Sequence, residues 1–317
     1  MSATAKKGGR GSAAWRWLTS AILLGTLFLL VDTTALWREL QRIPLWVVLP
    51  AVLLSVVQVV ISSWRWRYTG KRLGLSIGLG DAVQEYYLAT FINQVLPGGI
   101  LGDVSRALRH GAKAGKRQKA AHAVAIERLS GQLVLALMVG LGLVVLWQAN
   151  VFKPSLVGSS AAIGWLPIIL LLAIACGLLL LRRYNARFKS YLLAFRDDVH
   201  QALFSWPALP LQLISSLLVM ASYLAVFLLL AVAADYVNSA AAAAVILALC
   251  TVLLLSMVVP LTVAGWGIRE GAAALLWPLA GLPAEQGVAL SVGYGALVFI
   301  GSCPGALVLL KGGRDLS

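Results

Sequence analysis

Residues 209–234 read LPLQLISSLLVMASYLAVFLLLAVAA, a run that contains no charged side chain. A transmembrane helix needs about 20 predominantly apolar residues to cross the hydrocarbon core of a bilayer. Over the whole chain 60% of residues are hydrophobic and 12% are charged, whereas soluble domains average about 45–50% and about 25%. The sequence therefore predicts an all-α polytopic membrane protein without a separate soluble domain.

Apolar runs of similar length lie on both sides of this one. We expect spans at 15–31, 43–63, 123–147, 163–181, 209–234, 240–259 and 286–310, and a shorter helix at 268–279. Together these make about eight transmembrane helices in a single domain over residues 15–310. A basic cytoplasmic tail, residues 1–14, precedes the domain, and a second cytoplasmic tail, residues 311–317, follows it.

The net charge of +14 is distributed unevenly along the chain. With the N-terminus inside, the predicted cytoplasmic segments carry 21 basic residues and the opposite side carries 3. Lys and Arg collect on cytoplasmic segments of membrane proteins, so we expect both termini to be cytoplasmic. The same rule accounts for the basic balance without a nucleic-acid partner, and the basic segments are suited to anionic lipid head groups.

The charge pattern also constrains residues 77–105. The flanking basic stretches, 64–76 and 106–120, both belong on the cytoplasmic side. About 29 residues are too few for two full spans, and Pro97-Gly98-Gly99 interrupts the segment. We expect a re-entrant hairpin with its tip at this interruption. Irregular backbone at membrane depth is tolerated only where it is buried in protein or lines a wet cavity, so the hairpin predicts a cavity.

A second interruption affects residues 260–279. A helix over 268–279 would be about 18 Å long, too short for a core of about 30 Å, and it suggests a discontinuous helix. The first break reads NQVLPGGILGDVSR (93–106) and the second reads VPLTVAGWGIREG (259–271). Each has a Pro, a Gly five residues later, and then an acid and a base. Paired broken helices mark the binding site in transporters built from inverted repeats, so an inverted repeat is possible here.

These breaks have residue types suited to an anionic head group. A helix N-terminus offers free N–H groups and a partial positive charge, and Arg106 and Arg269 can grip a phosphate bidentately. Asp103 and Glu270 would orient the arginines or bind an amine or a sugar hydroxyl. The alternative interpretation is that both breaks are loop turns with ordinary snorkelling charges.

Other polar positions near the breaks allow two interpretations each. Asn93 can cap freed backbone groups or contact a head group. Glu127 and Arg128 open a span, where Glu also favours the helix dipole. The candidate substrate-binding residues are Asn93, Gly98, Gly99, Asp103, Arg106, Glu127, Arg128, Gly265, Gly267, Arg269 and Glu270.

Asp81 and Glu85 lie on one face of the hairpin's first arm. Acids embedded in the membrane are functional candidates. They could equally lie at the cytoplasmic interface and pair with Arg65 or Lys71. Near the same end, Trp64 and Trp66 are typical of interfacial anchors.

No motif for a cofactor or a metal is present. The three cysteines lie inside apolar runs, and the three histidines have no ligand-like spacing. We expect no metal, no cofactor and no catalytic residue. Because there is no ATP-binding motif, any transport would be downhill, ion-coupled or driven by the membrane potential.

The breaks resemble the signatures of a known family. NQVLPGGILGDVSR resembles the first signature of the lysylphosphatidylglycerol synthase/flippase transmembrane family. PLTVAGWGIRE (260–270) resembles its second, usually a Gly-rich GGlGxrE, with Ala264 where Gly is more usual. Ile126-Glu127-Arg128 resembles a third. The three occur in the family's order, and the resemblance covers nearly the whole chain.

The resemblance implies a protein of the bacterial cytoplasmic (inner) membrane that translocates a lipid or handles a lipid-linked substrate. We expect no aminoacyl-transferase domain after residue 317, and so lysyl transfer from tRNA is not expected of this chain. Our hypothesis is a flippase-like translocase for a lipid or lipid-linked head group. The rivals are a membrane-embedded lipid transferase with Asp103 or Glu270 as general base, and an accessory subunit that presents lipid to a lipid-biosynthesis enzyme. The lipid, the direction and the oligomeric state are open.

Overall fold

The computed structural model describes residues 9–96, 99–151, 186–258 and 262–312, and the regular structure within these ranges is helical. The elements are α1 (Gly9–Leu30), α2 (Thr33–Gln41), a short 3-10 turn η1 (Leu45–Val47), α3 (Val48–Arg72), α4 (Leu79–Val95), α5 (Leu101–Ala114), α6 (Arg117–Gln148), α8 (Ala186–Val199), a π-helical turn η2 (His200–Phe204), α9 (Ala208–Ala233), α10 (Ala240–Ser256), α11 (Ile268–Leu279), α12 (Ala284–Ser302) and α13 (Pro304–Gly312).

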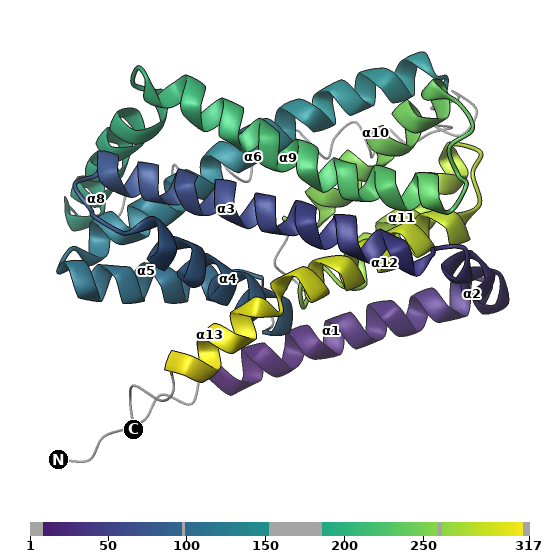
Figure 1. Ribbon diagram of the computed structural model, residues 1–317, viewed down its shortest axis with the longest axis horizontal. Helices are drawn as coiled ribbons and strands as arrows, with labels where there is room; N and C mark the ends of the chain where they lie inside the picture. The colour runs from purple at the N-terminus through teal and green to yellow at the C-terminus, as the bar shows by residue number, and fades with distance from the viewer. Residues whose placement is uncertain (1–8, 97–98, 152–185, 259–261, 313–317) are drawn as a thin grey trace.

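Four helical stretches in the described residues are long and apolar enough to cross a membrane. They are Leu45–Arg72, Arg117–Gln148, Ala208–Ala233 and Ala284–Leu310. Two shorter apolar helical stretches, Trp17–Thr26 and Ala240–Ser256, accompany them. An all-helical membrane protein is therefore confirmed, and the long helices run along the length of the molecule (Figure 1).

Several boundaries agree closely with the sequence. The span expected at 209–234 is α9, and the short helix expected at 268–279 is α11. The span expected at 286–310 is interrupted, because α12 ends at Ser302 and α13 begins at Pro304. Pro304 lacks the N–H that would continue the helix. The span expected at 163–181 lies outside the described residues, as does most of each tail, although α1 already begins at Gly9 and α13 reaches Gly312.

The basic stretches between the expected spans are largely helical, although no helix was expected there. Helix α3 continues to Arg72, helix α5 continues to Ala114, and α8 and η2 cover 186–204. Only a two-residue connection, Gly115 and Lys116, joins α5 to α6. Arg and Lys are good helix formers, so a cluster of positive charge identifies the side of the membrane but does not mark a loop.

The segment around the first break folds as two packed helices. Helices α4 and α5 pack against each other, α5 also packs on α6, and α13 packs on α4 (Figure 1). Gly102 makes the α4–α5 contact possible, because a Cβ at this position would overlap the backbone of Ala89. The expected helix–break–helix arrangement is present, and its second arm, α5, extends beyond residue 105 to Ala114.

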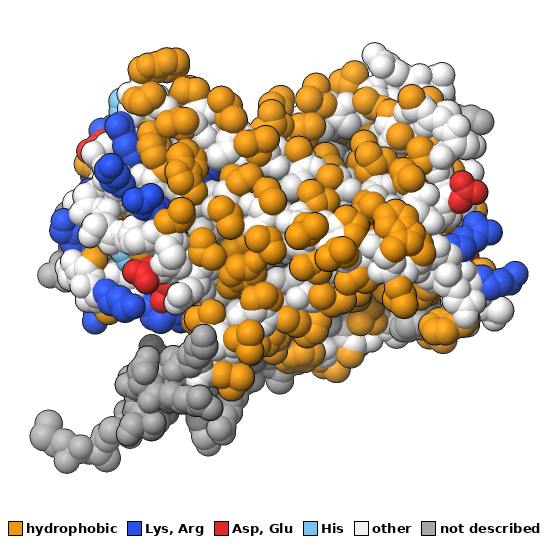
Figure 2. Space-filling model, viewed as in Figure 1, with side chains coloured by type: hydrophobic (Ala, Val, Ile, Leu, Met, Phe, Trp, Pro, Cys, Tyr) orange, Lys and Arg blue, Asp and Glu red, His pale blue; other side chains and the backbone are white. Residues whose placement is uncertain are grey.

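Apolar and basic side chains occupy different parts of the molecular surface. Figure 2 shows hydrophobic side chains across the middle of the visible face, whereas Lys and Arg gather toward its ends. Exposed apolar residues such as Leu53, Leu137 and Leu218 come from three of the four long apolar helical stretches. A belt of this kind suits a protein whose middle faces lipid and whose ends face water.

Candidate functional site

A cavity of about 270 Å³ lies where the two breaks meet. The first break contributes Asn93, Gln94 and Gly99, and the second contributes Thr262, Ala264 and Gly265. Helices α3, α4, α6, α9, α10 and α12 supply the remaining walls. The two breaks, more than 160 residues apart in the sequence, therefore line one cavity, as their shared pattern predicts. This is called the central cavity below.

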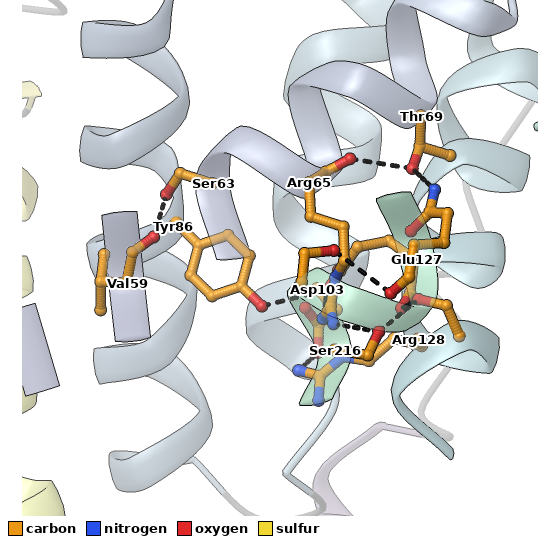
Figure 3. A network of polar contacts seen from close by, with 12 residues as sticks. Val59, Ser63, Arg65, Thr69, Tyr86, Asp103, Glu127, Arg128 and Ser216 are labelled. Atoms are coloured by element: carbon orange, nitrogen blue, oxygen red, sulfur yellow. Dashed lines mark hydrogen bonds and ion pairs between the residues drawn. The ribbon is translucent and has the colours of Figure 1, made fainter. Parts of the chain in front are cut away.

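A network of ion pairs (Figure 3) lies beside the central cavity, which is lined by three of its members, Arg65, Glu127 and Arg128. Glu127 of α6 is fully buried and accepts hydrogen bonds from Arg65 of α3 and from Arg106 of α5, the latter at 2.6 Å. Arg106 also donates to Asp103 at 3.0 Å, and Asp103 in turn accepts from Arg128. Three guanidinium groups thus share two carboxylates, which leaves one net positive charge.

Aromatic rings enclose the buried arginine of this network. The Cζ atom of Arg106 lies 4.8 Å from the ring centre of Trp66 and 4.5 Å from that of Tyr86. Such cation–π contacts stabilise a desolvated guanidinium. Trp66 is itself only 1% exposed, so the expectation that it is an interfacial anchor is wrong, because it packs inward over Arg106.

The first break is capped from within the protein. Asn93 accepts a hydrogen bond from the backbone N–H of Gly102 at 2.7 Å and donates to Asp103 at 3.1 Å. Of its two interpretations, capping is confirmed, and one of the N–H groups at the start of α5 is thereby occupied. Gly99 has φ +61°, a left-handed conformation that favours glycine. Gly98 lies outside the described residues.

The second break has a similar arrangement, with one arginine and one carboxylate. Arg269 donates to Glu270 at 2.8 Å and to Ser291 of α12 at 2.7 Å, and all three side chains are buried. The rings of Trp266 and Tyr294 lie 5.4 and 5.3 Å from its Cζ atom. Each break therefore places an arginine against a carboxylate and between two aromatic rings.

The glycines of the second break adopt left-handed backbone. Gly265 has φ +81° and Gly267 has φ +90°. Gly267 donates its N–H to Glu270 at 2.6 Å, which caps α11, and a Cβ on Gly267 would press on Leu23 of α1. Ala264 also has positive φ, +51°, which costs a residue with a Cβ roughly 1–2 kcal/mol and gives a physical reason why Gly suits this position.

The arginines differ in what they offer a ligand. Arg106 and Arg269 are 0% and 1% exposed, and neither lines the central cavity. Both already hold carboxylates, so the structure does not place them as free phosphate ligands. Arg128 does line the cavity, and its side chain is 47% exposed. Asp103, Gly267 and Glu270 likewise lie behind the lining residues.

Sequence reasoning missed several lining residues. Arg65 was assigned to a cytoplasmic loop because it belongs to a cluster of basic residues, yet it is buried and donates to Ser216 at 2.7 Å. Tyr86 and Tyr223 also line the cavity. Ser216, one of several polar residues in a span without charged side chains, was a usable signal, because polar groups in membrane helices face the bundle interior.

Asp81 and Glu85, the two acids of the hairpin's first arm (α4), do not form the ion pairs that were expected. Glu85 pairs with Arg109 of α5 at 2.6 Å, and not with Arg65 or Lys71. Asp81 is exposed and has no ion pair within the described ranges. Neither lines the central cavity.

The lining of the central cavity combines polar and apolar side chains. The polar lining residues include Arg65, Arg128, Asn93, Gln94 and Gln132, and the apolar ones include Leu135, Val219, Met220, Leu254, Met257, Val258 and Val298. Such a lining suits an amphiphile with a negatively charged polar group, because the net charge of the network is positive.

Comparisons with known proteins identify the family to which the chain belongs. No curated protein and no solved structure matches the chain. The family model of the lysylphosphatidylglycerol synthase transmembrane region matches residues 15–305, a range that includes both breaks, the central cavity and nearly all of the four long apolar stretches. The chain therefore belongs to the family of the lysylphosphatidylglycerol synthase transmembrane region.

Proposed function

We propose that this protein binds the anionic head group of a membrane lipid, or of a lipid-linked substrate, in the central cavity and moves it between the leaflets. The observation that carries the proposal is Arg128, a half-exposed guanidinium facing a cavity between two helix breaks. Family membership supports a lipid as the substrate. The protein would work in the bacterial cytoplasmic membrane.

The proposed topology has about eight crossings and both termini in the cytoplasm. Helices α4 and α5 form a re-entrant hairpin that enters from the cytoplasmic side, and an approximate two-fold axis in the membrane plane relates the two breaks. The repeated arrangement of a buried arginine, a carboxylate and two aromatic rings supports this relation. Inverted repeats of this kind permit alternating access to a fixed site.

The rival functions make different predictions. A lipid transferase needs a group able to accept a proton, but no His or Cys lines the central cavity in the described residues, and Glu127 is held by two arginines. A transferase would form product in detergent from purified protein. An accessory subunit would co-purify with a lipid-biosynthesis enzyme and transport nothing by itself.

Replacing Arg128 tests the transport proposal. Arg128→Gln removes the exposed cation, and hydrogen bonds to charged groups contribute about 1.5–3 kcal/mol. We expect at least about a tenfold loss of transport rate. The measurement is the rate at which a fluorescent phosphatidylglycerol becomes inaccessible to an impermeant quencher in proteoliposomes. Arg38→Gln, on the exposed surface of α2, is the matched control, and equal rates in the two variants would rule out Arg128 as the ligand-binding cation.

Cysteine labelling tests the topology. In a background without native cysteines, Gln118→Cys at the start of α6 should be shielded from an impermeant thiol reagent added outside the cell. Gln41→Cys at the end of α2 should react, because both positions are exposed but lie on opposite sides in the proposed topology. Labelling of position 118 from outside would refute the hairpin.

A further inference from the structure

A second cavity, of about 480 Å³, lies at the end of the molecule where α5 turns into α6. Its walls come from residues 76–78, the start of α4, the end of α5 and one residue of α13, and they include Asp81, Gln84, Glu85, His110, Lys113 and Val308. It shares no lining residue with the central cavity. The two cavities are therefore lined by different residues, and this one is called the end cavity below.

His110 is the polar group that points to a ligand. It is only 7% exposed and lines the end cavity, with its ring packed edge-on against Trp66 at 5.5 Å. Within the described part of the chain neither ring nitrogen has a hydrogen-bond partner. Neither nitrogen is sealed off inside the protein, so both are open to a hydrogen-bonding molecule in the cavity.

The charges around His110 have opposite signs and remain unpaired. Asp81 and Lys113 both line the end cavity, and neither forms an ion pair in the described ranges. Glu85 is held by Arg109. Gly78, also in the lining, precedes α4 without a side-chain cap, so the first N–H groups of that helix are open. The cavity thus offers a carboxylate and a histidine nitrogen for a cation, and a lysine with helix N–H groups for an anion.

A metal ion does not match these residues. No three His, Cys, Asp or Glu side chains in the described part of the chain are grouped closely enough to hold one. A single molecule with both charges satisfies Asp81 and Lys113 together. An ammonium donates hydrogen bonds to carboxylate and imidazole acceptors, and a phosphate accepts from lysine and helix N–H groups.

The surroundings indicate a lipid as the source of such a molecule. Val308 lies on α13 between Leu307 and Leu309, whose side chains are 62% and 51% exposed. Because α13 continues the apolar stretch Ala284–Leu310, acyl chains can lie along it while the head group enters the cavity. We infer that the end cavity binds a zwitterionic group in which an ammonium is joined to a phosphate, as in phosphatidylethanolamine. This site goes beyond the proposed transport site.

The test compares two lipids that differ only at the ammonium. Purified full-length protein in detergent is titrated with dipalmitoyl phosphatidylethanolamine or with the phosphatidylcholine of the same chains, and bound lipid is counted by native mass spectrometry. The trimethylated nitrogen of phosphatidylcholine has no N–H to donate. We expect phosphatidylethanolamine to bind about ten times more tightly. Equal binding of the two lipids overturns the inference.

Two variants separate the two halves of the head group. Asp81→Asn should lower phosphatidylethanolamine binding to the level of phosphatidylcholine, whereas Lys113→Gln should weaken both lipids alike, because they share the phosphate. Asp197→Asn is the matched control, since Asp197 is an exposed acid on α8, at the same end of the molecule (Figure 1). If Asp81→Asn and Asp197→Asn have equal effects, the carboxylate assignment is wrong.

Two further measurements identify the source of the bound head group and keep this test separate from a failure of the transport proposal. Soluble phosphoethanolamine that displaces the lipid at equal concentration would identify a free metabolite as the ligand, and no displacement would identify the lipid itself. Arg128→Gln should keep the preference for phosphatidylethanolamine, because Arg128 lies only in the central cavity. Loss of the preference in Arg128→Gln would assign it to the central cavity and overturn the second site.

Discussion

Glu127→Gln is expected to lower the stability of the protein more than any other conservative change in the ion-pair network. The fully buried carboxylate of Glu127 holds the buried guanidinium groups of Arg65 and Arg106. Removing one partner of a buried ion pair typically costs about 3–5 kcal/mol, because the remaining charge is left uncompensated in a low-dielectric environment. The measurement is thermal unfolding of purified protein in detergent, with the yield of inserted protein as a second readout.

Two further variants provide the comparison for the unfolding temperature of Glu127→Gln. Glu285→Gln, in the first turn of α12, makes the same chemical change where no ion pair is present in the described residues, and it should unfold close to the wild-type temperature. Asp103→Asn should have an intermediate effect, because its buried partner Arg106 keeps its ion pair with Glu127, and its other partner Arg128 is half-exposed and can be solvated by water. If Glu127→Gln unfolds at the wild-type temperature, the network does not stabilise the fold.

Gly102→Ala is the second change with a large expected effect. An added Cβ would overlap the backbone carbonyl of Ala89, which no side-chain movement can relieve. Helices α4 and α5 would have to separate, and the hydrogen bond from the Gly102 N–H to Asn93 would weaken. Overpacking costs typically about 1–3 kcal/mol, occasionally more, and the backbone contact here puts Gly102→Ala at the upper end. We expect a lower unfolding temperature together with a loss of transport.

The control for this change is another helical glycine. Gly140 lies in α6, and a methyl group added to its Cα would have no neighbouring atom within 4 Å. Gly140→Ala should be neutral or slightly stabilising, because Ala has the higher helix propensity by about 1 kcal/mol. Equal unfolding temperatures for Gly102→Ala and Gly140→Ala would show that the close α4–α5 contact is not required.

Much of the candidate site was visible in the sequence because its signals are local. Pro, Gly and charged residues stand out against apolar runs, and they identified both breaks and the helix Ile268–Leu279. Asn93, Gly99, Glu127, Arg128 and Gly265 were selected in this way, and all line the central cavity. The roles of Arg106 and Arg269 were not visible, because an arginine that binds a ligand and one that holds a buried carboxylate look the same in sequence.

The sequence by itself determined that this is a helical membrane protein with two broken segments, since apolar run length and charge distribution respond directly to the bilayer. Only the tertiary structure decided which charges pair. Arg65 and Glu127 are 62 positions apart and meet through the packing of α3 on α6. Pairing of this kind depends on distances between helices, which a single sequence does not encode locally. It leaves Arg128 facing the central cavity and Arg106 enclosed between Trp66 and Tyr86, because a buried charge is stable only where other helices bring it a partner.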